Sequence, residues 1–157
     1  MKLYFSLSRG LLAALLCIIL STLLISGSFV SAINQSKNGS TNALRCEFAQ
    51  SIGCEIKEEL LSQKEITIPI EFGEVYNSYN SLQKRAGFDL ERYKGANATV
   101  YTYQVLSHGA FKKDDNVRLN LIVYKGKIIG GDISSVDLSG KMIPLLREEE
   151  LYGKTAS

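Results

Sequence analysis

The 157-residue chain is poor in the residue types that build metal centres and catalytic relays. It has one histidine, three cysteines, two prolines and no tryptophan. Because His108 is the single imidazole, we expect no metal, no cofactor and no catalytic residues. The composition, with 45% hydrophobic and 22% charged residues, also excludes wholesale disorder, a collagen-like fibre and a coiled-coil rod.

Charged residues are absent between Arg9 and Lys37, a stretch that holds a dense run of leucine and isoleucine. A basic start followed by such a run indicates an export signal, and the run is long enough to cross a ~30 Å hydrocarbon core. We interpret residues 1–32 as a signal peptide or signal anchor that crosses the cytoplasmic membrane through residues 10–30. The expected location is the cell membrane, single-pass, with the C-terminal domain outside. The alternative is secretion after cleavage near Ala32.

The formal net charge of +2 does not indicate a nucleic-acid partner. Lys2 and Arg9 account for all of it, so the remainder of the chain is formally neutral. Binding to a phosphate backbone requires a clustered basic surface, and the sequence supplies only short basic pairs. We therefore expect no nucleic acid among the partners.

The chain after residue 32 divides into three parts by composition. Residues 33–41 are small and polar, which is typical of a linker. Residues 42–146 are long enough for one hydrophobic core and alternate between helical and strand patterns. Residues 147–157 are rich in glutamate and small polar residues, and we interpret them as a polar tail.

The patterns in residues 42–146 predict an α+β domain in the order α-β-β-α-β-β-β. A helix of about Glu71 to Ala86 is the strongest, because its apolar residues, Val75 among them, recur on one face at spacings of three and four. The last three strands are predicted to form an antiparallel meander packed on this helix. The expected elements are a helix capped by Thr41 or Asn42 and ending near Ile52, strands at 54–58 and 65–69, the long helix with a left-handed stop at Gly87, and strands at 100–105, 117–124 and 127–133.

Two glycines inside the last predicted strand mark a candidate site. Paired glycines in a strand indicate a β-bulge or a close approach by backbone or ligand. The adjacent carboxylate can accept hydrogen bonds from polar side chains of the long helix. We leave two interpretations open, a structural bulge anchored by the aspartate and a ligand site. The candidate residues are Tyr79, Asn80, Gln83, Gly130, Gly131 and Asp132.

Cys46 and Cys54 are the cysteines outside the apolar N-terminal run. They lie on a predicted helix and the strand that follows it. Outside the cytoplasm a disulfide between them is permitted, and two buried thiols are the alternative.

Short motifs in the domain resemble an uncharacterised family found in exported, often membrane-anchored proteins of Gram-positive bacteria, mainly clostridia and their relatives. The resemblance covers about Leu44 to Leu146 and implies location and domain identity only, because the family has no established activity. The motifs that carry it include Ile68-Pro69, Val75-Tyr76, Gly87-Phe88-Asp89-Leu90, Tyr101-Thr102-Tyr103 and Ile129-Gly130-Gly131-Asp132.

The sequence departs from this family at three places. Cys54 stands where the family tends to carry tryptophan, and the family's cysteine near Ile133 is absent. Residues 141–144 replace an aromatic and histidine-containing ending, so a role for that histidine does not transfer to this chain.

These observations favour a non-enzymatic domain outside the cytoplasm that binds an envelope protein or a cell-wall component. The alternative is a small hydrolase-like enzyme that uses Asp132 with Asn80 and Tyr79. An enzyme predicts a concave pocket in which a carboxylate meets these polar side chains. A binding module predicts an exposed apolar patch or an unpaired strand edge.

Overall fold

The computed structural model describes residues 37–111, 116–137 and 140–153 of the chain. The predicted signal peptide or anchor, residues 1–32, lies outside this part, as do the last four residues of the predicted tail. Within the described ranges, no helix is long and apolar enough to cross a membrane.

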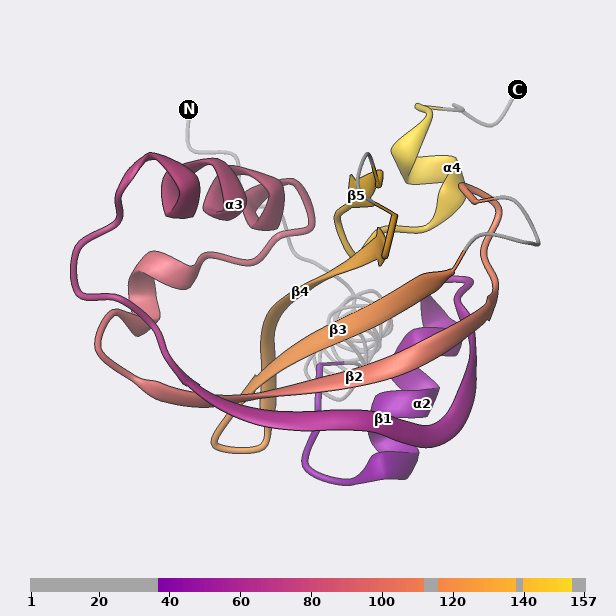
Figure 1. Cartoon of the computed structure of the whole chain (residues 1–157), viewed down its shortest axis with the longest axis horizontal. Coiled ribbons are helices and arrows are strands. Elements are labelled where there is room, and N and C mark those ends of the chain that lie inside the picture. Colours follow the sequence, from indigo (N-terminus) through magenta and orange to yellow (C-terminus); the bar gives the residue numbers. More distant parts are fainter. Residues whose placement is uncertain (1–36, 112–115, 138–139, 154–157) are drawn as a thin grey trace, which may run out of the picture. The chain divides into compact units, whose positions relative to one another are not determined.

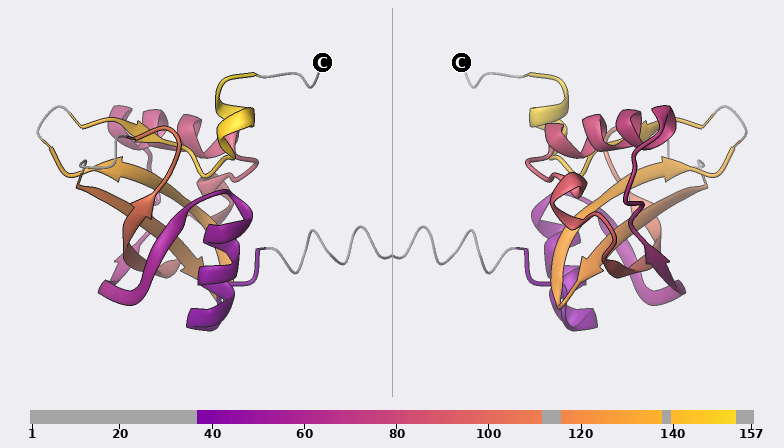
Figure 2. Two further views of the ribbon diagram at one scale, coloured as in Figure 1. Left: turned by 90° about the vertical axis from the view of Figure 1, so that its right-hand side faces the viewer. Right: turned by 90° about the vertical axis from the view of Figure 1, so that its left-hand side faces the viewer.

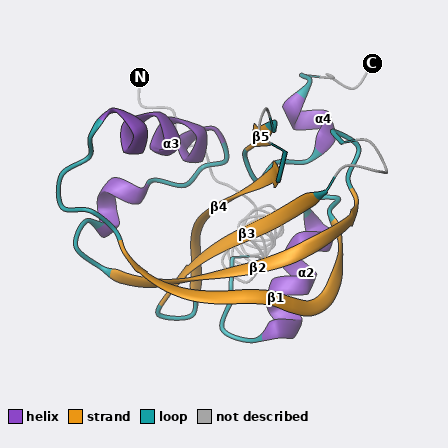
Figure 3. Ribbon diagram, viewed as in Figure 1, coloured by secondary structure: helices purple, strands orange, loops and turns teal. Residues whose placement is uncertain are grey.

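The described residues form an α+β domain around one antiparallel sheet of five strands (Figures 1 and 3). The strands lie in the sheet in the same order as in the sequence, which makes β1 and β5 the two edges. The predicted antiparallel pairing of the last three long strands is confirmed. The strands are β1 (Glu55–Thr67), β2 (Asn97–Ser107), β3 (Val117–Tyr124), β4 (Lys127–Ser135) and β5 (Met142–Ile143).

The two strands predicted at 54–58 and 65–69 are the two ends of one continuous strand, β1. Between Ile56 and Ser62, β1 carries extra residues relative to β2, so its pairing register shifts there. Such bulges break the alternation of side chains on which a strand prediction depends. The middle of β1 was missed for this reason.

Four helices complete the domain, and the first begins at the predicted cap. The hydroxyl of Thr41 accepts a hydrogen bond of 3.3 Å from the backbone N–H of Leu44, and Gly53 follows the helix with a φ of 72°. The short helix α4 falls in the predicted polar tail. The helices are α2 (Asn42–Ser51), α3 (Glu74–Arg85), the 3-10 helix η1 (Leu90–Tyr93) and α4 (Glu148–Leu151).

The sheet buries a different apolar cluster on each face, because side chains alternate along a strand. Tyr103 and Val105 of β2 belong to the larger cluster, which includes Phe48 of α2. Ala98 of β2 belongs to the smaller cluster, which includes Leu90 of η1. The strands therefore run between α2 and α3, as the views in Figures 1 and 2 show.

A buried arginine ties the segment before α2 to the sheet. Arg45 donates hydrogen bonds from Nε to the hydroxyl of Tyr103, at 2.7 Å, and from Nη1 to the carbonyl of Gly39, at 2.8 Å. Its guanidinium lies 3.7 Å from the ring centroid of Tyr101. Gly39 in turn donates to the carbonyl of Gly126 at 2.9 Å, so part of the predicted linker lies against the β3–β4 turn.

The face that α3 turns to the sheet is more polar than predicted. The helix begins at Glu74, and Val75, which was expected on the buried face, is 81% exposed. The fully buried side chains of α3 are those of Asn80 and Gln83. The helix ends before Gly87, whose φ of 71° confirms the predicted left-handed stop.

Asn80 and Asp89 hold η1 against the end of α3. The Asn80 side chain donates to the Asp89 carboxylate at 3.0 Å and accepts from the backbone N–H of Leu90 at 2.8 Å. Asp89 also accepts from the backbone N–H of Glu91 at 3.2 Å. The Asn80 hydrogen bond is the main cause that lowers the pKa of Asp89 from 3.8, and the Glu91 N–H and nearby Lys84 add to it.

Because the folded state lowers the pKa of Asp89, this carboxylate stabilises the protein above pH 3.8, and the contribution is lost as pH falls through the folded pKa. We expect Asp89→Asn to reduce the difference between the urea midpoints measured at about pH 6 and about pH 3. Glu71→Asn, at an exposed glutamate, is the control and should leave this difference as in the unmodified chain. An unchanged pH dependence in Asp89→Asn would contradict the role assigned to its carboxylate.

Candidate functional site

Asp132 lies under α3 with both carboxylate oxygens hydrogen-bonded. It is 4% exposed. The hydroxyl of Tyr79 donates to Oδ2 at 2.9 Å, and the side-chain amide of Asn120 donates to Oδ1 at 3.0 Å. The hydroxyl of Thr102 donates to the Asn120 carbonyl oxygen at 2.9 Å, which extends the network across three strands. The network joins β2, β3 and β4 to α3.

Gln83 pairs with the backbone of Gly131 as a neighbouring strand would. Its side-chain NH₂ donates to the Gly131 carbonyl at 2.9 Å, and its side-chain oxygen accepts from the Gly131 N–H at 2.8 Å. A Cβ atom on the preceding residue, Gly130, would lie 2.8 Å from the side-chain oxygen of Gln83. The predicted close approach of the backbone is therefore made by a helix side chain.

The glycines also lie beside a bulge in β4. Ile122 pairs with Gly130 while Val123 pairs with Ile128, so β4 has one extra residue there. Gly131 has a φ of 152°, and a Cβ atom on it would collide with the carbonyl oxygen of Asn120. This position therefore requires glycine.

The structure brings five of the six candidate residues together, and Asn80 is the exception. Its amide faces Asp89 and Leu90 instead of Asp132. The partner that sequence reasoning missed is Asn120 of β3, which lies directly opposite Asp132 in the sheet. No signal in the sequence identifies it, because the bulge in β4 shifts the register of the β3–β4 hairpin by one residue.

The chemistry of this network is that of a structural anchor. Burial, and then the charge of Asp132, raise the pKa of Tyr79, so its hydroxyl stays protonated and acts as a donor. Both oxygens of Asp132 and both polar atoms of the Gln83 amide already have protein partners. These atoms are therefore engaged in holding α3 on the sheet.

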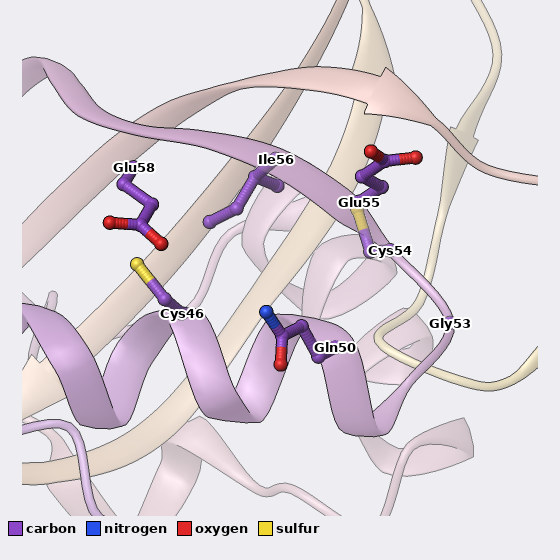
Figure 4. A pocket seen from close by; sticks show the side chains of 7 residues that line it. All are labelled: Cys46, Gln50, Gly53, Cys54, Glu55, Ile56 and Glu58. Atoms are coloured by element: carbon purple, nitrogen blue, oxygen red, sulfur yellow. The ribbon is translucent and has the colours of Figure 1, made fainter.

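A pocket of about 270 Å³ lies away from this network, between α2 and β1 (Figure 4). Cys46 and Cys54 both line it, and both are buried free thiols. Burial raises the pKa of Cys54 to about 12. Burial, and then the charge of Glu58, raise the pKa of Cys46. Both thiols therefore stay protonated near neutral pH, which makes them poor nucleophiles.

The side of β1 away from β2, which we call the outer edge of β1, pairs with no other described strand. The strand is 13 residues long and most of its side chains are exposed, including Leu61 at 46%. Near the end of β1, Ile70 and Val75 are also exposed apolar side chains. The outer edge of β1 thus pairs with no described strand, although the carbonyl of Glu58 accepts a hydrogen bond of 3.0 Å from the side chain of Asn42.

Two further features of the described residues concern metal binding and the histidine. No group of three or more histidine, cysteine, aspartate or glutamate side chains among them could hold a metal ion. His108, which follows β2, is buried, and its Nδ1 accepts a hydrogen bond of 3.2 Å from the backbone of Ala110.

Removing the Gln83 amide should destabilise the domain strongly. In Gln83→Leu the buried N–H and C=O of Gly131 both lose their partner, which we expect to lower the free energy of unfolding by about 3 kcal/mol. Gln63→Leu, at an exposed position of β1, is the control, with an expected change of less than about 0.5 kcal/mol. Urea denaturation followed by circular dichroism measures both, and equal losses in the two variants would contradict the anchor.

A methyl group at Gly131 should cost more than one at a glycine with open surroundings. Gly131→Ala combines a positive φ with a collision against the Asn120 carbonyl, and we expect a loss of at least about 3 kcal/mol. Gly53 has a φ of 72°, and no atom lies within 4 Å of the position that a methyl group would take there. Gly53→Ala therefore isolates the backbone strain, at about 1 kcal/mol. Similar urea midpoints for the two variants would refute the close contact.

Comparison with known proteins places the domain in a family. No curated protein and no solved structure matches the chain. A family model described as "Domain of unknown function (DUF4830)" matches residues 45–133, which are more than half of the 157 residues. The match includes most of α2, all of β1 to β3, and the candidate residues up to Asp132. The chain therefore belongs to this family of domains of unknown function (DUF4830).

Proposed function

We propose that the domain is a non-enzymatic binding module, and that a segment of a partner protein adds to the outer edge of β1. The observation that carries this proposal is the edge itself, which is 13 residues long and unpaired within the described residues. Ordinary strands have about 5 or 6 residues. Natural proteins usually keep edge strands short or cover them, because exposed N–H and C=O groups recruit other strands. A long open edge is what strand addition by a partner requires.

The polar cluster under α3 supports a binding module over the hydrolase-like alternative. Asp132 is buried and bonded to Tyr79 and Asn120, and Asn80 faces another carboxylate. None of the six candidate residues lines the pocket between α2 and β1. A catalytic carboxylate has to reach a substrate, and these side chains already hold one another.

The apolar run near the N-terminus supports a place for this binding outside the cytoplasm. In this proposal residues 10–30 hold the protein in the cytoplasmic membrane and the domain faces outward, or the domain is secreted after cleavage near Ala32. The partner is then an envelope protein, or a protein attached to the cell wall. The formal neutrality of the chain after residue 32 is consistent with a partner bound through backbone hydrogen bonds.

The proposal is tested by selecting peptides on the full-length chain. Random peptides of about 10 residues, the upper length of an ordinary strand, are displayed and enriched for binding. We expect selected peptides to slow hydrogen exchange of backbone amides in β1, because an added strand bonds the outward N–H groups. Scrambled versions of the same peptides are the control. Slower hydrogen exchange that is confined to elements other than β1 would contradict the proposal.

Two proline variants make the test specific to the outer edge of β1. Neighbouring residues such as Lys64 and Glu65 direct their N–H groups to opposite sides of a strand. One of Lys64→Pro and Glu65→Pro therefore breaks a bond to β2, while the other removes an outward N–H. We expect the variant that keeps the native urea midpoint to lose peptide binding. Unchanged peptide affinity in that folded variant would overturn the proposal.

A further inference from the structure

The pocket between α2 and β1 adjoins the first residues of β1, the strand with which the proposed partner segment pairs. The pocket is lined by residues of α2, of β1 and of the turn between them, so it lies beside an edge strand of the sheet. Figure 4 shows β1 above and α2 below the lining side chains. The lining residues are Cys46, Gln50, Gly53, Cys54, Glu55, Ile56 and Glu58.

The size and lining of the pocket suit one side chain of mixed character. Its volume of about 270 Å³ is below the roughly 300–1,000 Å³ of clefts that take whole small molecules. Cys46, Cys54 and Ile56 are buried and form its apolar part. Gln50 and the glutamates are exposed and form its polar rim. Such a pocket fits an apolar stem that ends in a polar group.

The rim carries two carboxylates, and the described cation that acts on the pocket is the buried Arg45, whose charge opposes the effect of Glu58 on the pKa of Cys46. Glu55 and Glu58 form no salt bridge with a described lysine or arginine. The nearest basic residue along β1, Lys57, pairs with Glu59 at 3.8 Å. The buried Cys46 thiol, which points toward Glu58 in Figure 4, has no hydrogen bond to another described residue. The polar end of an occupant is therefore expected to be a cation.

We propose that this pocket takes a lysine side chain of the segment that pairs with β1, an inference that rests on the proposed function. The methylene stem contacts Cys46, Cys54 and Ile56, and the ammonium group lies among the rim residues. The acceptor for the ammonium group is the carboxylate of Glu58, which lies beside the Cys46 thiol, whereas the carboxylate of Glu55 lies at the other end of the lining (Figure 4). Specificity in strand addition comes from pockets of this kind beside the edge, while the backbone bonds supply affinity.

The first test uses n-butylammonium chloride, which reproduces a lysine side chain, with n-butanol as the neutral control. Amide chemical shifts of the full-length chain, kept in a non-ionic detergent, are recorded during titration. We expect butylammonium to shift the amides of Cys46, Cys54 and Glu58, and butanol to have a much smaller effect. Glu58→Gln should weaken the response about tenfold, the value of one charged hydrogen bond. Glu59→Gln, which changes a glutamate outside the pocket, should leave it unchanged.

The second test uses the selected peptides and separates this inference from the proposed function. We expect one lysine position to be enriched, and its replacement by norleucine to weaken binding about tenfold in the unmodified chain but little in Glu58→Gln. Peptides that protect β1 without a lysine preference would overturn the lysine pocket and leave the strand addition standing. A butylammonium response without any protection of β1 would sink the proposed function. Titration with Zn²⁺ that shifts these amides while butylammonium does not would also overturn the lysine pocket.

Discussion

The pairing between the Gln83 side chain and the backbone of Gly131 fixes α3 on the sheet. The amide satisfies both polar groups of a buried residue whose own φ and surroundings exclude any side chain. The apolar cluster on this face is small, and the fully buried residues of α3 are polar. Hydrogen bonds depend on direction, whereas apolar contacts do not. The position of α3 is therefore set by polar geometry, which the adjacent Tyr79–Asp132 bond reinforces.

The sequence predicted the elements whose patterns are regular. The helix from Asn42, the helix that ends before Gly87, and the β3–β4 hairpin were found from caps and periodicity. The single strand β1 was divided in two, because its bulges and its exposed edge remove the alternation that marks a half-buried strand. The short strand β5 has two residues, too few for any period to show. The sequence pattern of a regular helix or strand lies within its own residues, whereas a bulge depends on the neighbouring strand.

In the candidate site, too, the local features were predicted, and those that depend on a neighbouring strand or on residues beyond the helix were not. The glycine pair predicted that another group approaches the backbone of β4 closely. The helical spacing placed Tyr79 and Gln83 on the face of α3 that contacts β4. A two-residue turn at Lys125–Gly126 would place Asn120 opposite Gly131, but the bulge in β4 moves it opposite Asp132. The sequence does not reveal such a shift of one residue. Asn80 was misplaced because its partner, Asp89, lies beyond the end of the helix.

The charges of β1 also affect how one copy of the domain meets another. From Ser62 to Thr67 the strand pairs with β2 without a register shift, so this is the regular half of the edge. Two copies related by a twofold axis would pair this half antiparallel. The residue at the axis would then lie opposite the same residue of the other copy. A centre at Lys64 would oppose two ammonium groups, and a centre at Glu65 would oppose two carboxylates, which is unfavourable in either case. These two registers of self-pairing are therefore disfavoured, a constraint that does not apply to a different polypeptide with its own charge pattern.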